Sequence, residues 1–156
     1  MDVQRTRFGD MTCSIARTLD SVGEPWSPLI IRDVFLGISR FDSLQRDLRI
    51  SRKVLAQRLA WLVDHGILER RPYSVRPPRH EYTLTDKGLE FYEVLLAMSA
   101  WGDRWTAGDD GPPALFRHRR CGKITHAELR CSKCGARLRA AEVDVIPGPG
   151  YRSTGA

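Results

Sequence analysis

Three cysteines and one histidine carry the clearest chemical pattern in the chain. The segment 131–135 reads C-x-x-C-G, and the segment 118–122 repeats it with a histidine in the first position. Paired turns of this kind let two side chains converge on one tetrahedral metal ion, and the glycine permits the tight turn. The spacing therefore predicts a structural zinc site, with the ligands His118, Cys121, Cys131 and Cys134.

Three other interpretations of these residues stay open. The site could have lost its metal, or Cys131 and Cys134 could form a redox pair. His126 also lies within reach of the predicted hairpin and could replace His118 as a ligand. Zinc is favoured because the segment has too few apolar residues to fold without a metal. Four protein ligands leave no open position for water, so the zinc would be structural rather than catalytic.

The spacing of apolar residues ahead of this module predicts four short helices. They are expected at residues 13–22, 25–36, 41–48 and 51–66. In the fourth helix an apolar stripe of Leu55, Leu59, Leu62 and Val63 faces away from Lys53, Gln57, Trp61 and Asp64, with Arg52 and Arg58 on the flanks. A helix with long polar side chains at its N-terminal front suits the DNA major groove.

A β-hairpin with a cationic tip is predicted next. Two strand-like pieces, Ile67–Tyr73 and His80–Leu84, flank a loop that holds two prolines. Arg76 and Arg79 are expected at the tip of this loop. Directly after a helix–turn–helix, such a wing favours phosphate or minor-groove contact over a plain solvated hairpin. The predicted fold class is mainly α with a small β-hairpin (α+β), a winged helix–turn–helix followed by a small zinc-ribbon-like module.

A last long helix is expected from Thr85 to about Trp105, and it is apolar on nearly all sides in its middle. One small domain cannot bury such a helix, so a second copy is the simplest cover. We therefore expect a homodimer held by the N-terminal helix and the helix 85–105. The alternative is that the N-terminal helix wraps the last helix within one chain. The two-fold symmetry of operator half-sites favours the dimer.

The net charge of +6 favours a polyanionic partner. The basic residues gather in two blocks, 32–80 and 115–140, separated by the acidic segment 81–114, although solvated faces alone would also give this pattern. No apolar run reaches the ~20 residues that a membrane span needs, and the N-terminus lacks the apolar stretch of a secretion signal. A cytoplasmic protein without membrane contact is therefore expected. The sequence lacks a glycine-rich phosphate loop, H-E-x-x-H and G-x-S-x-G, which argues against an enzyme.

Composition predicts five parts of the chain. They are an N-terminal arm (1–12), the winged domain (13–105), a linker rich in proline and glycine (106–114), the zinc-ribbon-like module (115–146) and a loose tail (147–156).

Several of these strings resemble the HxlR family of winged helix–turn–helix regulators. The similarity is carried by residues 13–23 (CSIARTLDSVG), Trp26, 30–33 (IIRD), 40–41 (RF), Leu44, 50–51 (IS), 53–55 (KVL), 58–59 (RL), 66–67 (GI), 77–88 (PPRHEYTLTDKG) and 101–102 (WG). It implies a homodimeric, cytoplasmic, sequence-specific transcriptional regulator of a bacterium or archaeon, and we expect a repressor. The chain departs from the family at Glu24-Pro25-Trp26, where Gly-Lys-Trp is usual, and at Trp61, where a charged residue is usual.

Site residues follow from this resemblance by position. It implies base reading by Ser51, Arg52, Lys53 and Gln57, a phosphate or structural contact by Arg58, and wing contacts by Arg76 and Arg79.

Cys13 is the candidate redox or electrophile sensor, because members of the family often sense oxidants through a cysteine near this position. Arg17, one turn further on, could lower the pKa of its thiol. A buried and inert helical cysteine is the equal alternative. For the whole protein, the rival function is an RNA-binding or protein-docking adaptor that uses the basic zinc ribbon.

Overall fold

A computed structural model describes residues 8, 11 and 13–151 of the chain. Most of the predicted arm 1–12 and the end of the predicted tail, 152–156, lie outside the described residues. The described residues divide into two compact units: the first holds those up to residue 89 together with 147–151, and the second holds 90–146. Among the described residues, no helix combines the length and the apolar character that crossing a bilayer requires.

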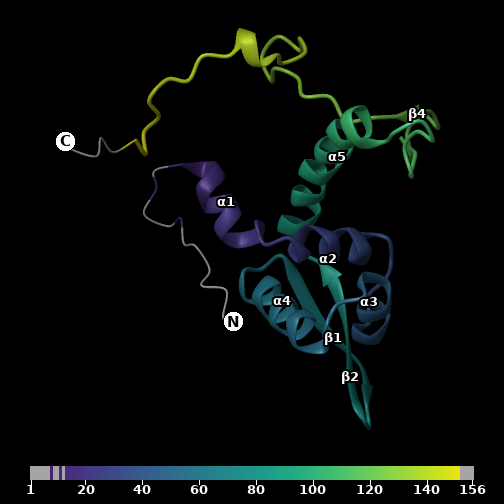
Figure 1. Cartoon of the computed structure of the whole chain (residues 1–156). Coiled ribbons are helices and arrows are strands. Elements are labelled where there is room, and N and C mark those ends of the chain that lie inside the picture. Colours follow the sequence, from purple (N-terminus) through teal and green to yellow (C-terminus); the bar gives the residue numbers. More distant parts are fainter. Residues whose placement is uncertain (1–7, 9–10, 12, 152–156) are drawn as a thin grey trace. The chain divides into compact units, whose positions relative to one another are not determined.

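The first unit is a helix–turn–helix with a β-hairpin (Figure 1). Its elements are α1 (Ser14–Val22), α2 (Trp26–Phe35), α3 (Phe41–Leu48), α4 (Arg52–Asp64), β1 (Leu68–Val75), β2 (Pro78–Leu84) and the start of α5 (Asp86–Thr106). The predicted α+β winged fold is thereby confirmed. The four predicted helices correspond to α1–α4, with ends that differ by a few residues.

The core of this unit is built from the apolar faces of α2, α3 and α4 together with the start of β1. Its fully buried members are Ile30, Ile31, Leu44, Leu55, Leu59, Leu62 and Leu68. The predicted stripe of α4 thus faces inward, and burying each of its leucines contributes about 1.5–3 kcal/mol. Since this stripe is fixed in the core, the opposite side of α4 has to face solvent.

Arg32 links α2 to α3 and also pairs with a buried carboxylate on its own helix. Asp33 is 1% exposed, and Arg32 forms an ion pair with it at 2.6 Å while lying 3.6 Å from Asp47 on α3. Burial raises the pKa of Asp33 above its ordinary value, and the hydrogen bond from Arg32 acts in the opposite direction. The turn between α3 and α4 then passes through Arg49, in the left-handed region, and the buried Ile50.

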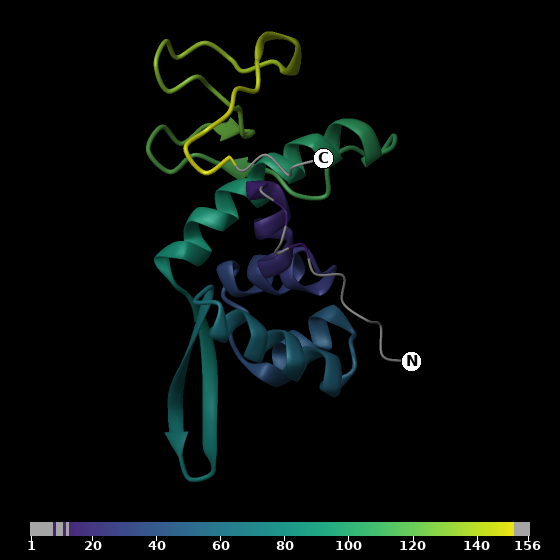
Figure 2. The ribbon, with the colours of Figure 1, turned by 90° about the vertical axis from the view of Figure 1, so that its left-hand side faces the viewer.

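The hairpin is longer than the sequence indicated, because its strands continue through the predicted loop. Val75 pairs with Pro78 and Ser74 with Arg79, so only Arg76 and Pro77 form the tip. The prediction that Arg79 stands in the loop was wrong, since it lies on β2. Pro72 is accommodated at a shift of register between Pro72 and Ser74, where the ladder is interrupted. Figure 2 shows the hairpin projecting past the helices of its unit.

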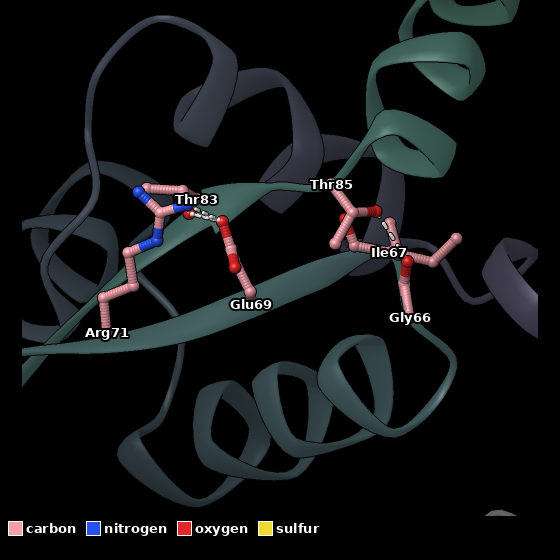
Figure 3. Close-up of polar contacts among 6 residues, drawn as sticks. All are labelled: Gly66, Ile67, Glu69, Arg71, Thr83 and Thr85. Carbon is pink, nitrogen blue, oxygen red and sulfur yellow. Dashed lines mark hydrogen bonds and ion pairs between the residues drawn. The ribbon is translucent and has the colours of Figure 1, made fainter.

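Thr85 lies at the base of the hairpin, where the end of α4, the start of β1, the end of β2 and the start of α5 meet. Its hydroxyl donates to the Gly66 carbonyl at 2.6 Å and accepts from the Gly88 N–H at 3.2 Å. The Thr85 N–H donates to the Ile67 carbonyl at 3.1 Å. On the adjacent strands Glu69 binds both Thr83 and Arg71 (Figure 3). This junction fixes the end of α4 against the start of β1 and the start of α5.

In the second unit, 90–146, β3 (Phe116–Arg117) pairs antiparallel with β4 (Ile124–Thr125), and a 3-10 turn η1 (Ala140–Glu142) follows. No residue between 107 and 146 is buried. Any fixed structure of this segment therefore needs a source of stability other than an apolar core.

Gly88 is required by close packing, and this gives a test of the junction. A Cβ at position 88 would lie 2.3 Å from the Ile67 carbonyl oxygen. Gly88→Ala should therefore lower the free energy of unfolding by about 2 kcal/mol, measured by urea denaturation.

The matched control is Gly102→Ala in the same helix, where the nearest atom to an added Cβ is Thr106 Oγ1 at 3.8 Å. This variant should be unchanged or stabilised by up to ~1 kcal/mol, because alanine favours helix over glycine. Equal stability of the two variants would contradict the proposed junction.

Candidate nucleic-acid interface

The exposed face of α4 carries three of the predicted base-reading residues. Arg52, Lys53 and Gln57 are all exposed, and Lys53 and Gln57 lie one helical turn apart on the same face. Ser51 caps the helix, because its Oγ accepts the Val54 N–H at 3.2 Å. The N-terminus of α4 therefore presents donors and long side chains to solvent together.

Arg52 is held at the start of α4 by two contacts from α3. Its guanidinium lies 4.8 Å from the centre of the Phe41 ring and 3.7 Å from an Asp42 carboxylate oxygen. Both charged side chains remain largely exposed, so the ion pair contributes little to stability. It orients the guanidinium while leaving donors free for a stronger acceptor, such as a phosphate.

A polar groove of about 500 Å³ lies between the α3 start and the hairpin. Its cationic lining is Arg40, Arg52, Arg70 and Arg79, His80 lies among them, and Asp42 is the acidic residue among the lining residues. Arg40 stacks over the Tyr73 ring at 4.5 Å, and Arg70 lies 2.8 Å from His80 Nδ1. The groove is therefore a concentrated positive surface that continues from the front of α4 to the hairpin.

Sequence reasoning missed Arg40 and Arg70 as site residues. Both belong to the basic block 32–80, but neither lies on the predicted recognition helix or the predicted loop. Arg40 reaches the groove because it forms an isolated bridge with Glu81, beside the bond from the Tyr82 N–H to the Ser39 carbonyl at 2.8 Å. This pairing joins residues that are far apart in the sequence, so the sequence alone carries no signal that places Arg40 in the groove.

Arg58 and Trp61 lie on the side of α4 that faces the rest of the unit. Arg58 is about one-fifth exposed and lies 3.5 Å from Glu24. Trp61 Nε1 donates to the Ser21 carbonyl at 2.9 Å, and its ring stacks on His65. Trp61 therefore does not stand on the free face of α4, as the helical projection predicted. Of the two roles expected for Arg58, this geometry favours the structural one.

The two wing arginines occupy different places. Arg76 is exposed at the two-residue tip, whereas Arg79 lines the groove from β2. Because the tip and the groove are separate surfaces, these residues can contact different parts of a nucleic acid.

Cys13 lies immediately before α1 and is half-buried. It occupies the N-cap position without a side-chain cap hydrogen bond. For the Arg17 side chain, the described residues supply a contact with Ser14 Oγ at 3.3 Å and none with the Cys13 thiol. In this arrangement the Arg17 side chain is turned to Ser14.

The other cysteines lie in two turns of the second unit. His118 Nδ1 is 3.3 Å from Cys121 Sγ in the first turn, and the Lys133 N–H points at Cys131 Sγ at 3.5 Å in the second. Hydrogen bonds from the backbone of Cys134 and Lys133 lower the pKa of the Cys131 thiol. Within the described part of the chain, no three or more His, Cys, Asp or Glu side chains gather closely enough to hold a metal ion.

Comparison with known proteins identifies the family of the winged unit. The model of the HxlR-like helix–turn–helix family matches residues 21–110, more than half of the chain. The chain belongs to the HxlR-like helix–turn–helix family. It is therefore a DNA-binding regulator of transcription, as its resemblance to that family predicted.

Relatives of this HxlR-like regulator include an uncharacterised helix–turn–helix transcriptional regulator of Mycobacterium tuberculosis. The two are 41% identical over 140 residues, which cover 90% of this chain and 89% of the relative. The similarity thus extends well past the winged unit.

Two solved structures are similar as well. PA1607, described as a candidate transcription factor, is 33% identical with a TM-score of 0.80, and the match covers 92% of this chain and 100% of that chain. The redox regulator HypR in its oxidised form is 31% identical with a TM-score of 0.55, over 59% of this chain and 96% of that chain.

Proposed function

We propose that this HxlR-like regulator acts as a homodimeric repressor, with α4 of each copy in successive major grooves of an operator. The carrying observation is the exposed pair Lys53 and Gln57 on α4, continuous with the cationic groove between α3 and the hairpin. A protein that reads chromosomal DNA in this way works in the cytoplasm of a bacterium or archaeon.

Base reading falls to the front of α4. Lysine suits the O6 and N7 acceptors of guanine, and glutamine can form a bidentate pair with adenine N6 and N7. Arg52 and the Ser51 hydroxyl lie where the DNA backbone passes the N-terminus of the helix, so they take phosphate or edge contacts. Because Arg58 pairs with Glu24 at 3.5 Å, the proposal gives Arg58 a structural role rather than a DNA contact.

The hairpin would contact the DNA beside the major groove. Arg79, together with Arg40 and Arg70, forms the cationic groove in which a phosphate would be neutralised. Arg76 at the projecting tip would reach the adjoining minor groove or the next phosphate. Phosphate contacts fix the register of the protein on the duplex without reading sequence.

Exposed apolar side chains on α1 and α5 support the proposed second copy. On α5, Val94, Met98, Trp101 and Trp105 are 49%, 55%, 64% and 69% exposed. Their spacing of four, three and four residues places them on one face of the helix. Ile15 and Leu19 on α1 are exposed too, at 72% and 45%. A dimer through α1 and α5 buries these residues and gives the regulator the symmetry of an operator.

Regulation through the Cys13 thiol fits this arrangement. The residue is half-buried before α1, and its oxidation would therefore change a helix that belongs to the proposed interface. A neighbour in structure, HypR, is described as a redox regulator, which supports a search for the same type of signal.

The alternative function is an RNA-binding or protein-docking adaptor that acts through the basic module 115–146. Gel shifts of the full chain with duplex DNA and with RNA of the same sequence separate the two. Tighter binding of the RNA would favour the adaptor.

The substitutions Arg79→Ala and Gln57→Ala should have different effects on DNA binding. With an operator found by footprinting upstream of the gene, Arg79→Ala should weaken binding to all sequences and reduce the slope of log K against log salt by about 1. Gln57→Ala should cost about 1–3 kcal/mol, blur one operator position and leave the slope unchanged. Arg17→Ala, exposed on α1, is the control. Equal salt slopes for wild type and Arg79→Ala would refute the wing assignment.

Charging the α5 stripe should separate the two copies. Trp101→Glu places a carboxylate in the proposed interface, and because the side chain is 64% exposed in one chain, the fold should survive. Light scattering should show a monomer with circular dichroism like that of wild type, and Glu93→Gln should remain dimeric. If Trp101→Glu is a dimer, or if the wild-type protein is a monomer, the proposed interface is contradicted.

Diamide should release wild-type protein from its operator but leave Cys13→Ser bound, since only the former carries the sensing thiol. Cys131→Ser is the matched control, because it keeps Cys13 and should respond as wild type does. The sensor assignment fails if operator binding by Cys13→Ser still collapses under diamide.

A further inference from the structure

The two cysteine-containing turns of the second unit have the same backbone structure. In the first, the Gly122 N–H donates to the His118 carbonyl at 2.8 Å, and in the second the Gly135 N–H donates to the Cys131 carbonyl at 2.8 Å. Gly122 and Gly135 both adopt positive φ angles, +69° and +73°. In these turns the first and fourth residues, which carry the donor side chains, are brought to the same side of a tight loop.

Each turn also closes a small hairpin. The first lies at the end of the β3–β4 pair, where the His118 N–H donates to the Lys123 carbonyl at 2.9 Å. The second is closed by the bridge between Arg130 and Arg137 and by the bond from the Leu138 N–H to the Leu129 carbonyl at 2.9 Å. The module 115–146 thus contains two hairpins of one design, each with two nitrogen or sulfur donors at its tip.

The donor pairs are preorganised within each turn. His118 Nδ1 and Cys121 Sγ are 3.3 Å apart, close to the separation of two ligands on one tetrahedral ion. In the second turn the Lys133 N–H points at Cys131 Sγ at 3.5 Å, and such a bond stabilises a thiolate. All three cysteines of the module are free of disulfides.

An apolar core cannot hold the two hairpins together. Leu115, Ile124, Leu129 and Leu138 are 66%, 56%, 65% and 44% exposed. Small modules of this kind need a metal or a disulfide to become stable. Among the described residues the two donor pairs do not meet in one cluster, so a shared ion would have to draw the two hairpins together. Binding such an ion would supply the missing folding free energy.

We propose that one zinc ion joins the two turns through His118, Cys121, Cys131 and Cys134. The ion displaces the thiol protons of the three cysteines to solvent, so that three thiolates and one neutral imidazole complete a tetrahedral set. The set is closed, and the ion is therefore structural. The basic side chains of the same hairpins, among them Arg119, Arg120 and Lys133, offset the negative charge of the thiolates.

This site is independent of the proposed DNA reading and is tested on the full chain. Protein purified under reducing conditions should contain one zinc per chain. Cys121→Ser and Cys131→Ser should each lose most of it, whereas Cys13→Ser, which removes a cysteine of the other unit, should keep it. His118→Asn should weaken zinc retention against a chelator, and His126→Asn should not, because His126 instead lies 3.7 Å from Glu128.

Cobalt substitution keeps the test decisive if a variant folds poorly. Zinc-free wild-type protein titrated with Co²⁺ should develop the thiolate charge-transfer and strong d–d bands of a tetrahedral site, saturating at one ion per chain. Absence of these bands, or full zinc retention by Cys131→Ser, would overturn the proposal. Zinc loss by His126→Asn with retention by His118→Asn would overturn the ligand set.

Discussion

The inward-facing leucine stripe of α4 is the constraint on which the rest of the molecule depends. Leu55, Leu59 and Leu62 are at most 1% exposed, so the rotation of α4 about its axis is fixed by the core. A shift of this pattern by two residues would bring Lys53 and Gln57 to the positions of Leu55 and Leu59 in the apolar interior, where an unpaired charge is very costly. Packing of the leucine stripe therefore directs the polar face of α4 to solvent. The side chains on that face are long and polar, and they suit a duplex groove.

The junction around Thr85 holds α4 and the hairpin in one arrangement, so that the exposed face of α4 and the cationic groove form two parts of one surface. Gly66, Ile67 and Gly88 meet there through backbone carbonyl and amide groups, so few other residue types fit. Because the same junction sets the direction of the hairpin, α4 and the cationic groove keep one relation to each other. A double helix can then be contacted on its bases and its phosphates without rearrangement, which lowers the entropic cost of binding.

Much of the winged unit could be predicted from sequence because its signals are local. The leucine spacing of α4, the cap at Ser51 and the turn signals around the hairpin each depend on neighbours in the chain. The predictions were wrong or incomplete where contacts between residues distant in the sequence determine the position of a side chain. Trp61 turned toward Ser21, and Arg40 joined the groove through a bridge to Glu81. Most of the predicted loop 74–79 proved to be strand, because Ser74 and Val75 pair with Arg79 and Pro78 and leave only Arg76 and Pro77 in the turn. For the module 115–146, the two turns were visible in the spacing of Cys and His, but their joining through a metal remains a proposal.

Site-specific photocrosslinking tests the central claim most directly, that the exposed face of α4 lies against DNA. A photoreactive side chain is placed either at Gln57 or at Thr18, which is exposed on α1. The account predicts efficient crosslinking to one base step in each operator half-site from position 57 and none from position 18. Crosslinking from position 18 alone, or none from position 57 on bound operator, would contradict it.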